Sequence, residues 1–172
     1  MKLGLKDKVV VITGGSKGIG FAAARLFVEE GAHVLISARS EDALNRACDE
    51  ISTKTGGTVD AFSSDVSVVS DLDALTAFVR ERYNRVDVLV NNAGTGTYKS
   101  FFKVTDDDLE YGMAINFFAQ FRLSQRLVPM MMKNGGGTIV NVAGRTAYQP
   151  ANPPGSTCTG PAKAAELRFT AD

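Results

Sequence analysis

The chain has 172 residues, with 19 basic residues, 19 acidic residues and one histidine. Its formal net charge of +0 argues against a nucleic-acid binder that relies on bulk positive charge. A hydrophobic share of 44% with 22% charged residues is typical of a globular protein rather than a disordered one, and the length fits one domain over residues 1–172.

Metal-binding and redox residues are few. Cys48 and Cys158 lie far apart in no recognisable motif, and His33 is the only histidine. The sequence therefore predicts neither a disulfide framework nor a metal site. No apolar run approaches the roughly 18 residues that span a membrane, so we expect a soluble, cytoplasmic protein with no membrane partner.

Apolar runs of strand length alternate with helical patterns. The first run, Lys8–Thr13, is nearly continuous, as expected for a strand covered on both faces. A helix is predicted from Gly18 to Glu30, with Gly31 as the glycine that ends it. The residues expected on its apolar face are Ile19, Ala22, Ala23, Leu26 and Phe27.

The alternation continues along the chain. Further strands are predicted at 33–37, 58–62, 86–90 and 138–142. Further helices are predicted at 40–54, 70–83, 106–132 and from 162 onward. Ser40 and Thr105 are expected as helix N-caps, Thr105 in a capping box with Asp108, and Pro129 is expected to kink or end its helix. This order predicts an α/β fold of the Rossmann-like, doubly wound type, a parallel sheet with helices on both faces.

The first strand runs directly into a glycine-rich turn, Thr13–Gly20, which opens the first helix. Glycines permit a tight turn and let the backbone approach a pyrophosphate, and the helix N-terminus offers it unpaired N–H groups. This position at a strand–helix junction favours a dinucleotide site; the alternative is a purely structural turn. The residues of the predicted site are Gly14, Ser16, Lys17, Gly18, Ile19 and Gly20.

The spacing of these glycines, TGxxxGxG, resembles the short-chain dehydrogenase/reductase family of the classical type. Asp65-Val66, the segment Asn91–Gly94 and Asn116 also fall where that family has motifs. The resemblance implies that Asp65 and Val66 lie against the adenine ring and that Asn116 supports a catalytic lysine through a water. It also implies that Asn92, Ala93 and Gly94 line the cofactor site. Within the family the chain is similar to 3-oxoacyl-carrier-protein reductases.

The end of the second strand indicates which nicotinamide cofactor fits. Many NAD-preferring members of the family carry Asp there, whereas this chain has Ala38 followed by Arg39. Arg39 is suited to bidentate pairing with a 2′-phosphate, and Lys17 adds a second positive charge. We therefore expect NADP(H) to be preferred over NAD(H). The alternative is that both side chains are solvated surface cations.

The catalytic motif of the family, YxxxK, is only partly present. Lys163 matches the lysine, which by the resemblance also binds the cofactor by holding the nicotinamide ribose. Thr159, however, stands where the family has Tyr, and Ala143-Gly144 replaces its serines. A phenol has a reference pKa near ~10, and an aliphatic hydroxyl is a far poorer acid. Candidate proton donors are Thr159, Tyr148 or a bound water. The alternative is that these are loop residues without a catalytic role.

The resemblance implies an NADP(H)-dependent oxidoreductase that transfers a hydride between nicotinamide and a small carbonyl or alcohol substrate. The alternative is an NADP(H)-binding module or truncated fragment with little or no catalysis. Family members continue past this chain, so we expect a domain that is incomplete at its C-terminus and lacks the last strands. A homo-oligomer through the fourth and fifth helices is expected from Phe117, Phe118, Phe121, Met130, Met131 and Met132.

Overall fold

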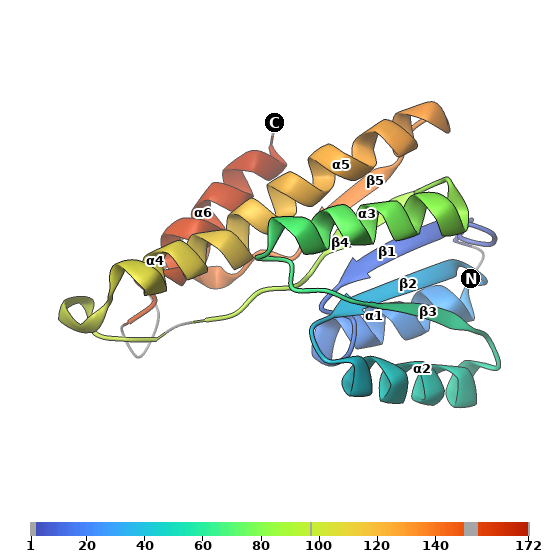
Figure 1. The fold of residues 1–172 in the computed structure, drawn as a ribbon, viewed down its shortest axis with the longest axis horizontal. Helices are drawn as coiled ribbons and strands as arrows, with labels where there is room; N and C mark the ends of the chain where they lie inside the picture. Colours follow the sequence, from blue (N-terminus) through green and yellow to red (C-terminus); the bar gives the residue numbers. More distant parts are fainter. Residues whose placement is uncertain (1–2, 97, 150–154, 172) are drawn as a thin grey trace.

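The computed structural model describes residues 3–96, 98–149 and 155–171. Its centre is a five-stranded sheet in the order β3-β2-β1-β4-β5, and all neighbouring strands are parallel (Figure 1). The predicted fold class is confirmed. The strands are β1 (Val9–Thr13), β2 (His33–Ala38), β3 (Val59–Ser63), β4 (Val88–Asn91) and β5 (Thr138–Asn141).

Helices cover both faces of the sheet (Figure 1). The helices α1 (Gly18–Glu29) and α2 (Glu41–Thr55) pack on one face, and α3 (Val69–Tyr83) and α5 (Ala119–Lys133) pack on the other. A last helix, α6 (Thr159–Thr170), lies beside α5 and β5. Two apolar cores therefore sandwich the strands. No helix in the described ranges is long and apolar enough to cross a membrane.

The predicted apolar face of α1 is wrong at Ile19, Ala22 and Leu26, which are exposed. The helix docks on the sheet through smaller residues because a Cβ at Gly20 would lie only 2.4 Å from the Gly14 carbonyl oxygen. Ile19 therefore does not pack on the sheet. It lies beside the glycine-rich turn, with 69% of its surface exposed. The residues that α1 buries are Gly20, Ala24 and Val28.

The helix predicted over 106–132 is interrupted. It consists of α4 (Asp106–Met113), a π-helical turn η2 (Ala114–Phe118) and α5, and it passes through Pro129 without ending. The capping box is confirmed, because Thr105 and Asp108 exchange side-chain-to-backbone hydrogen bonds. The Ser40 cap of α2 is confirmed as well. A 3.6-residue periodicity does not distinguish a π turn from regular helix, so the sequence does not predict the interruption.

The surface predicted for self-association divides in two. Met130 and Met131 are buried in the core beneath α5, whereas Phe118, Phe121 and Met132 are exposed. Phe121 also contacts Phe169 of α6, with ring centroids 5.2 Å apart. Self-association through this face stays a prediction, carried by fewer residues than the sequence indicated.

The segment after β5 is irregular, as predicted, but it contains a short helix η3 (Arg145–Ala147). Residues 150–154 of the predicted loop lie outside the described residues. The helix α6 begins at Thr159, three positions earlier than predicted, because Pro161 fits the first turn of a helix, where no N–H bond is lost. This places Thr159 and Lys163 on one rigid element.

Candidate cofactor and catalytic site

The glycine-rich turn has a backbone that only glycines adopt easily. Gly14 and Gly18 have φ angles of 67° and 59°. A Cβ at Gly15 would lie 2.5 Å from the Cβ of Ile36, so the turn lies directly on β2. The Nδ2 of Asn92 donates to the carbonyl oxygens of Thr13, at 2.9 Å, and Gly14, at 3.1 Å. The loop after β4 is thus fastened to the turn after β1.

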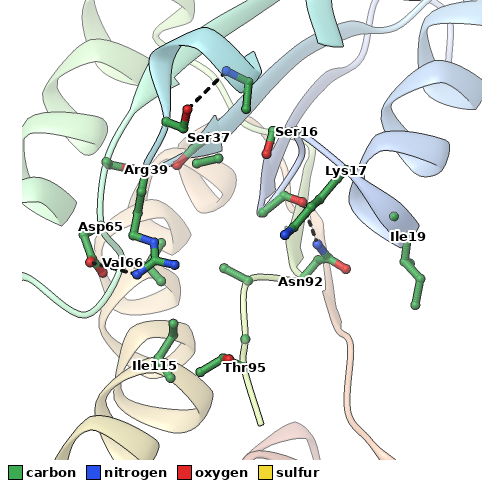
Figure 2. A pocket seen from close by; sticks show the side chains of 18 residues that line it. Ser16, Lys17, Ile19, Ser37, Arg39, Asp65, Val66, Asn92, Thr95 and Ile115 are labelled. Atoms are coloured by element: carbon green, nitrogen blue, oxygen red, sulfur yellow. Dashed lines mark hydrogen bonds and ion pairs between the residues drawn. The ribbon is translucent and has the colours of Figure 1, made fainter. Parts of the chain in front are cut away.

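Most residues predicted to bind the cofactor line one cavity of about 560 Å³ at the carboxyl edge of the sheet (Figure 2). Those residues are Gly14, Ser16, Lys17, Gly18, Ile19, Arg39, Asp65, Val66, Asn92, Ala93 and Gly94. Gly20 lies beneath the turn instead, and Lys163, also predicted to bind the cofactor, lines a second cavity. Sequence reasoning missed several further lining residues, among them Ser64, Thr95 and Ile115. Ser64 directly precedes Asp65, and Thr95 directly follows Gly94. Their position next to these motif residues could therefore have identified them from the sequence.

Two cations from neighbouring turns face this cavity (Figure 2). The side chain of Arg39 is 67% exposed, and its Nη1 lies 4.0 Å from Oδ2 of Asp65. Asp65 is itself held in place, because its Oδ1 accepts hydrogen bonds from the backbone N–H and hydroxyl of Ser67. Lys17 extends from the N-terminus of α1. Nη1 of Arg39 also donates to the Tyr111 hydroxyl at 3.4 Å, and the rest of the exposed guanidinium group faces the cavity.

A second cavity of about 410 Å³ adjoins the first and shares part of its wall. The shared residues are Ile19, Asn92, Gly94 and Thr95. The three predicted catalytic residues, Asn116, Thr159 and Lys163, all line this second cavity. Residues of η2, η3 and α6 meet there, which explains why positions distant in sequence converge at one place.

Asn116 lies in the π-helical turn η2, a type of distortion common at functional sites. Its Nδ2 donates to the carbonyl oxygens of Thr95, at 2.9 Å, and Gly112, at 3.0 Å, and its Oδ1 accepts from the Thr95 N–H. A Cβ at Gly94 would lie 2.8 Å from that Oδ1 and 3.5 Å from Nζ of Lys163. Asn116 and Lys163 therefore both approach the same glycine.

Lys163 is nearly buried, with 9% of its side chain exposed. Its Nζ donates to the carbonyl oxygen of Val142 at 2.9 Å and to Oε2 of Glu166 at 2.7 Å. Burial raises the pKa of Glu166, and the hydrogen bond from Lys163 offsets this effect only in part. Sequence reasoning missed Glu166, although its spacing of three residues from a helical lysine was a usable signal.

The hydroxyl groups near Lys163 differ from those expected. Tyr148 is 70% exposed and lines neither cavity, whereas Thr146 and Thr159 line the second. Tyr98, from the loop after β4, also lines the second cavity and was missed. A Cβ at Gly96 would lie 2.5 Å from Cε2 of Tyr98, so the ring packs directly on this glycine. The described lining thus contains one phenol, Tyr98.

The chain matches a family model described as short chain dehydrogenase over residues 8–171. It is 39% identical over 145 residues to the 7alpha-hydroxysteroid dehydrogenase of Escherichia coli (strain K12), covering 84% of this chain and 56% of that protein. It spans just over half the length of that relative.

Two solved structures share the fold closely. The L-sorbose reductase from Gluconobacter frateurii, complexed with NADPH and L-sorbose, superposes with a TM-score of 0.93 and 37% identity, covering 98% of this chain and 64% of that one. A 7alpha-hydroxysteroid dehydrogenase complexed with NADH superposes with a TM-score of 0.89 and 36% identity, over 96% and 63% of the two chains. The chain belongs to the short chain dehydrogenase family.

Proposed function

We propose that this chain binds NADP(H) in the first cavity and that a small ketone, aldehyde or matching alcohol binds in the second. The observation that carries this proposal is the wall shared by the two cavities, where Asn92, Gly94 and Thr95 face both. A cofactor in one cavity would therefore lie directly beside a substrate in the other. When bound, NADP(H) would supply or accept the hydride exchanged with the carbonyl carbon.

The glycine-rich turn fits a dinucleotide. Gly14 and Gly18 line the cavity with positive φ angles, so backbone without side chains would face a diphosphate there. Arg39 and Lys17 would hold a 2′-phosphate, and no carboxylate replaces Ala38 to repel it. Asp65 and Val66 would line the adenine pocket, and Lys163 would face the ribose of the nicotinamide. This charge pattern favours NADP(H) over NAD(H).

The proton for the substrate oxygen needs a donor in the second cavity. Tyr98, Thr146 and Thr159 all line it, and a phenol is a much stronger acid than an aliphatic hydroxyl. We therefore assign the donor to Tyr98, with Asn116 and Lys163 orienting the groups around it. The assignment differs from the family motif, in which the tyrosine lies four residues before the lysine.

A second candidate function is an NADP(H)-binding module with little turnover. Thr159 and Gly144 occupy positions at which the family carries its tyrosine and serine, and this substitution favours the candidate. Both functions share the cofactor cavity and differ only in the chemistry next to Lys163.

One experiment separates the two. The purified chain is titrated with NADPH and NADH while nicotinamide fluorescence and Tm are followed, and the NADPH complex is then mixed with a panel of small ketones and aldehydes. Saturable NADPH binding that raises Tm, followed by loss of the nicotinamide absorbance, supports the oxidoreductase. Binding without oxidation supports the module. Absence of binding by either cofactor would contradict both.

A further inference from the structure

A buried carboxylate lies directly behind Lys163. Glu166 is one helical turn further along α6, and its side chain is 0% exposed. Its Oε2 accepts the hydrogen bond from Lys163, while its Oε1 has no hydrogen-bond partner among the described residues. Burying a carboxylate with an unsatisfied oxygen is costly, and the compensation here comes from one cation.

The position of that cation matters for the cofactor cavity. The ammonium group of Lys163 lies within 3.5 Å of where a Cβ of Gly94 would be, and Gly94 faces both cavities. Two N–H groups of Lys163 are engaged by Val142 and Glu166, so a single N–H remains for a ligand. The electrostatic field at the cavity is that of an ion pair, which falls off faster than the field of an isolated charge.

We propose that Glu166 is a positioning residue that holds the ammonium group of Lys163 against the Val142 carbonyl and cancels its charge, which weakens the attraction of Lys163 for an anionic dinucleotide. The part that concerns the dinucleotide rests on the proposed function. The part that concerns the restraint of Lys163 does not.

The restraint is tested first, without any cofactor. Lysine residues are acetylated with limiting acetic anhydride, and the modification rate of Lys163 is followed by peptide mass spectrometry. In Glu166→Gln, Lys163 should react about threefold faster or more, because it loses the charged partner that stabilises its protonated form. The matched control is Glu50→Gln, which removes the partner of the exposed Lys54 and should leave Lys163 unchanged.

An unchanged rate for Lys163 in Glu166→Gln would overturn the proposal. Should that variant fail to fold, Glu166→Asp gives the same test, since it keeps the charge but withdraws the carboxylate by one methylene group. Faster modification in Glu166→Asp supports the restraint, and an unchanged rate contradicts it.

The effect on the cofactor is tested by the Kd for NADPH in four proteins: the original chain, Glu166→Gln, Lys163→Met and the double variant. Glu166→Gln should tighten NADPH binding about threefold to tenfold when Lys163 is present, because an uncompensated cation then faces the cofactor. It should change the Kd less than about twofold in the Lys163→Met background. An equal effect in both backgrounds would mean that Glu166 acts on the fold, and would overturn the proposal.

The NADPH titration and the acetylation rates test different parts of the proposal. Absence of NADPH binding by the original chain overturns the proposed function and the part of this inference that concerns the dinucleotide. The acetylation rates then still decide whether Glu166 restrains Lys163.

Discussion

The proposed cofactor cavity and the proposed catalytic cavity are built in different ways. The first is formed mostly by the ends of strands and by the residues that directly follow these ends, from the turn after β1 to the loop after β4. The second is formed by the loop after β4, by η2 and η3 and by one face of α6. The first cavity therefore depends on local backbone geometry, whereas the second depends on contacts between elements that are distant in sequence.

The largest expected effect is on the cofactor cavity. In Gly20→Ala, the new Cβ would lie 2.4 Å from the Gly14 carbonyl oxygen and 2.5 Å from Nδ2 of Asn92, so α1 must shift away from the turn. We expect NADPH affinity to fall by about a hundredfold or more and stability to fall by about 1–3 kcal/mol. Nicotinamide fluorescence and urea denaturation measure the two effects.

Ala22→Ser is the matched control for this variant, because Ala22 lies on the same helix and is exposed. It should leave the NADPH affinity unchanged and cost only about 0.5 kcal/mol, because Ser has a lower helix propensity than Ala. A Gly20→Ala protein that binds NADPH as tightly as the original chain would show that the turn is not the cofactor site.

The same contrast explains how much of the molecule the sequence predicts. Gly14, Gly18 and Gly20 signal their roles through spacing alone, because a tight strand–helix turn has few solutions. Tyr98 carries no such signal, and the three-residue spacing of Glu166 from Lys163 indicates a contact on one helix face but not its burial. Their roles follow from where α6 docks and from how one ring packs on Gly96, which are tertiary contacts.

The α1 helix shows why periodicity misleads near a site. Ile19 and Leu26 are apolar and correctly spaced for a core face, yet both are exposed. The close approach of Gly20 to the Gly14 carbonyl decides which face of α1 packs on the sheet. A hydrophobicity pattern does not detect this, because it scores side chains and Gly20 has none. The sheet order could be predicted because βαβ connections leave few alternatives, whereas the π turn at Asn116 could not.

The next largest effect concerns the catalytic cavity. Tyr98→Phe removes one hydroxyl and keeps the ring on Gly96, so NADPH binding should be unchanged. Carbonyl reduction should slow by about a hundredfold, the usual contribution of a positioned general acid. Single-turnover oxidation of bound NADPH measures the rate. Tyr148→Phe is the control, because Tyr148 lines neither cavity; equal slowing in both variants would contradict the role of Tyr98.

A smaller effect is expected for a variant that tests which cofactor the first cavity prefers. Arg39→Ala removes the guanidinium that faces the cavity beside Asp65. We expect roughly a tenfold weaker Kd for NADPH and less than about twofold for NADH, because only NADPH carries the 2′-phosphate. Arg46→Ala, an exposed arginine of α2 outside the cavity, should change neither. Equal weakening of both cofactors would mean that Arg39 does not select between them.

The smallest effect concerns the sheet that supports both cavities. Asp87 precedes β4, and its carboxylate accepts hydrogen bonds from the Val9 N–H, Arg85 and Lys8. Its burial acts to raise the pKa of the carboxyl group, but these hydrogen bonds outweigh burial and bring the pKa of Asp87 down to about 2. An unfolded Asp has a pKa near ~3.9, so the folded state favours the ionised form.

The sign of the pH dependence follows from that difference. The contribution of Asp87 to stability is complete above about pH 5 and is lost as pH falls from about 4 toward 2, where the folded carboxylate takes up its proton. Asp87→Asn should therefore cost about 1–2 kcal/mol at pH 7, after allowance for the exposed partner cations, and progressively less toward pH 2. Urea denaturation across this range measures the difference.

Asp73→Asn, which removes an exposed ion pair with Arg126, is the control and should cost less than about 0.5 kcal/mol at pH 7. Because Asp87 ties β1 to β4 at the amino end of the strands, opposite both cavities, its loss should lower the unfolding midpoint without separating NADPH binding from turnover. A variant that lost only one of the two functions would show that the cavities rest on different parts of the sheet.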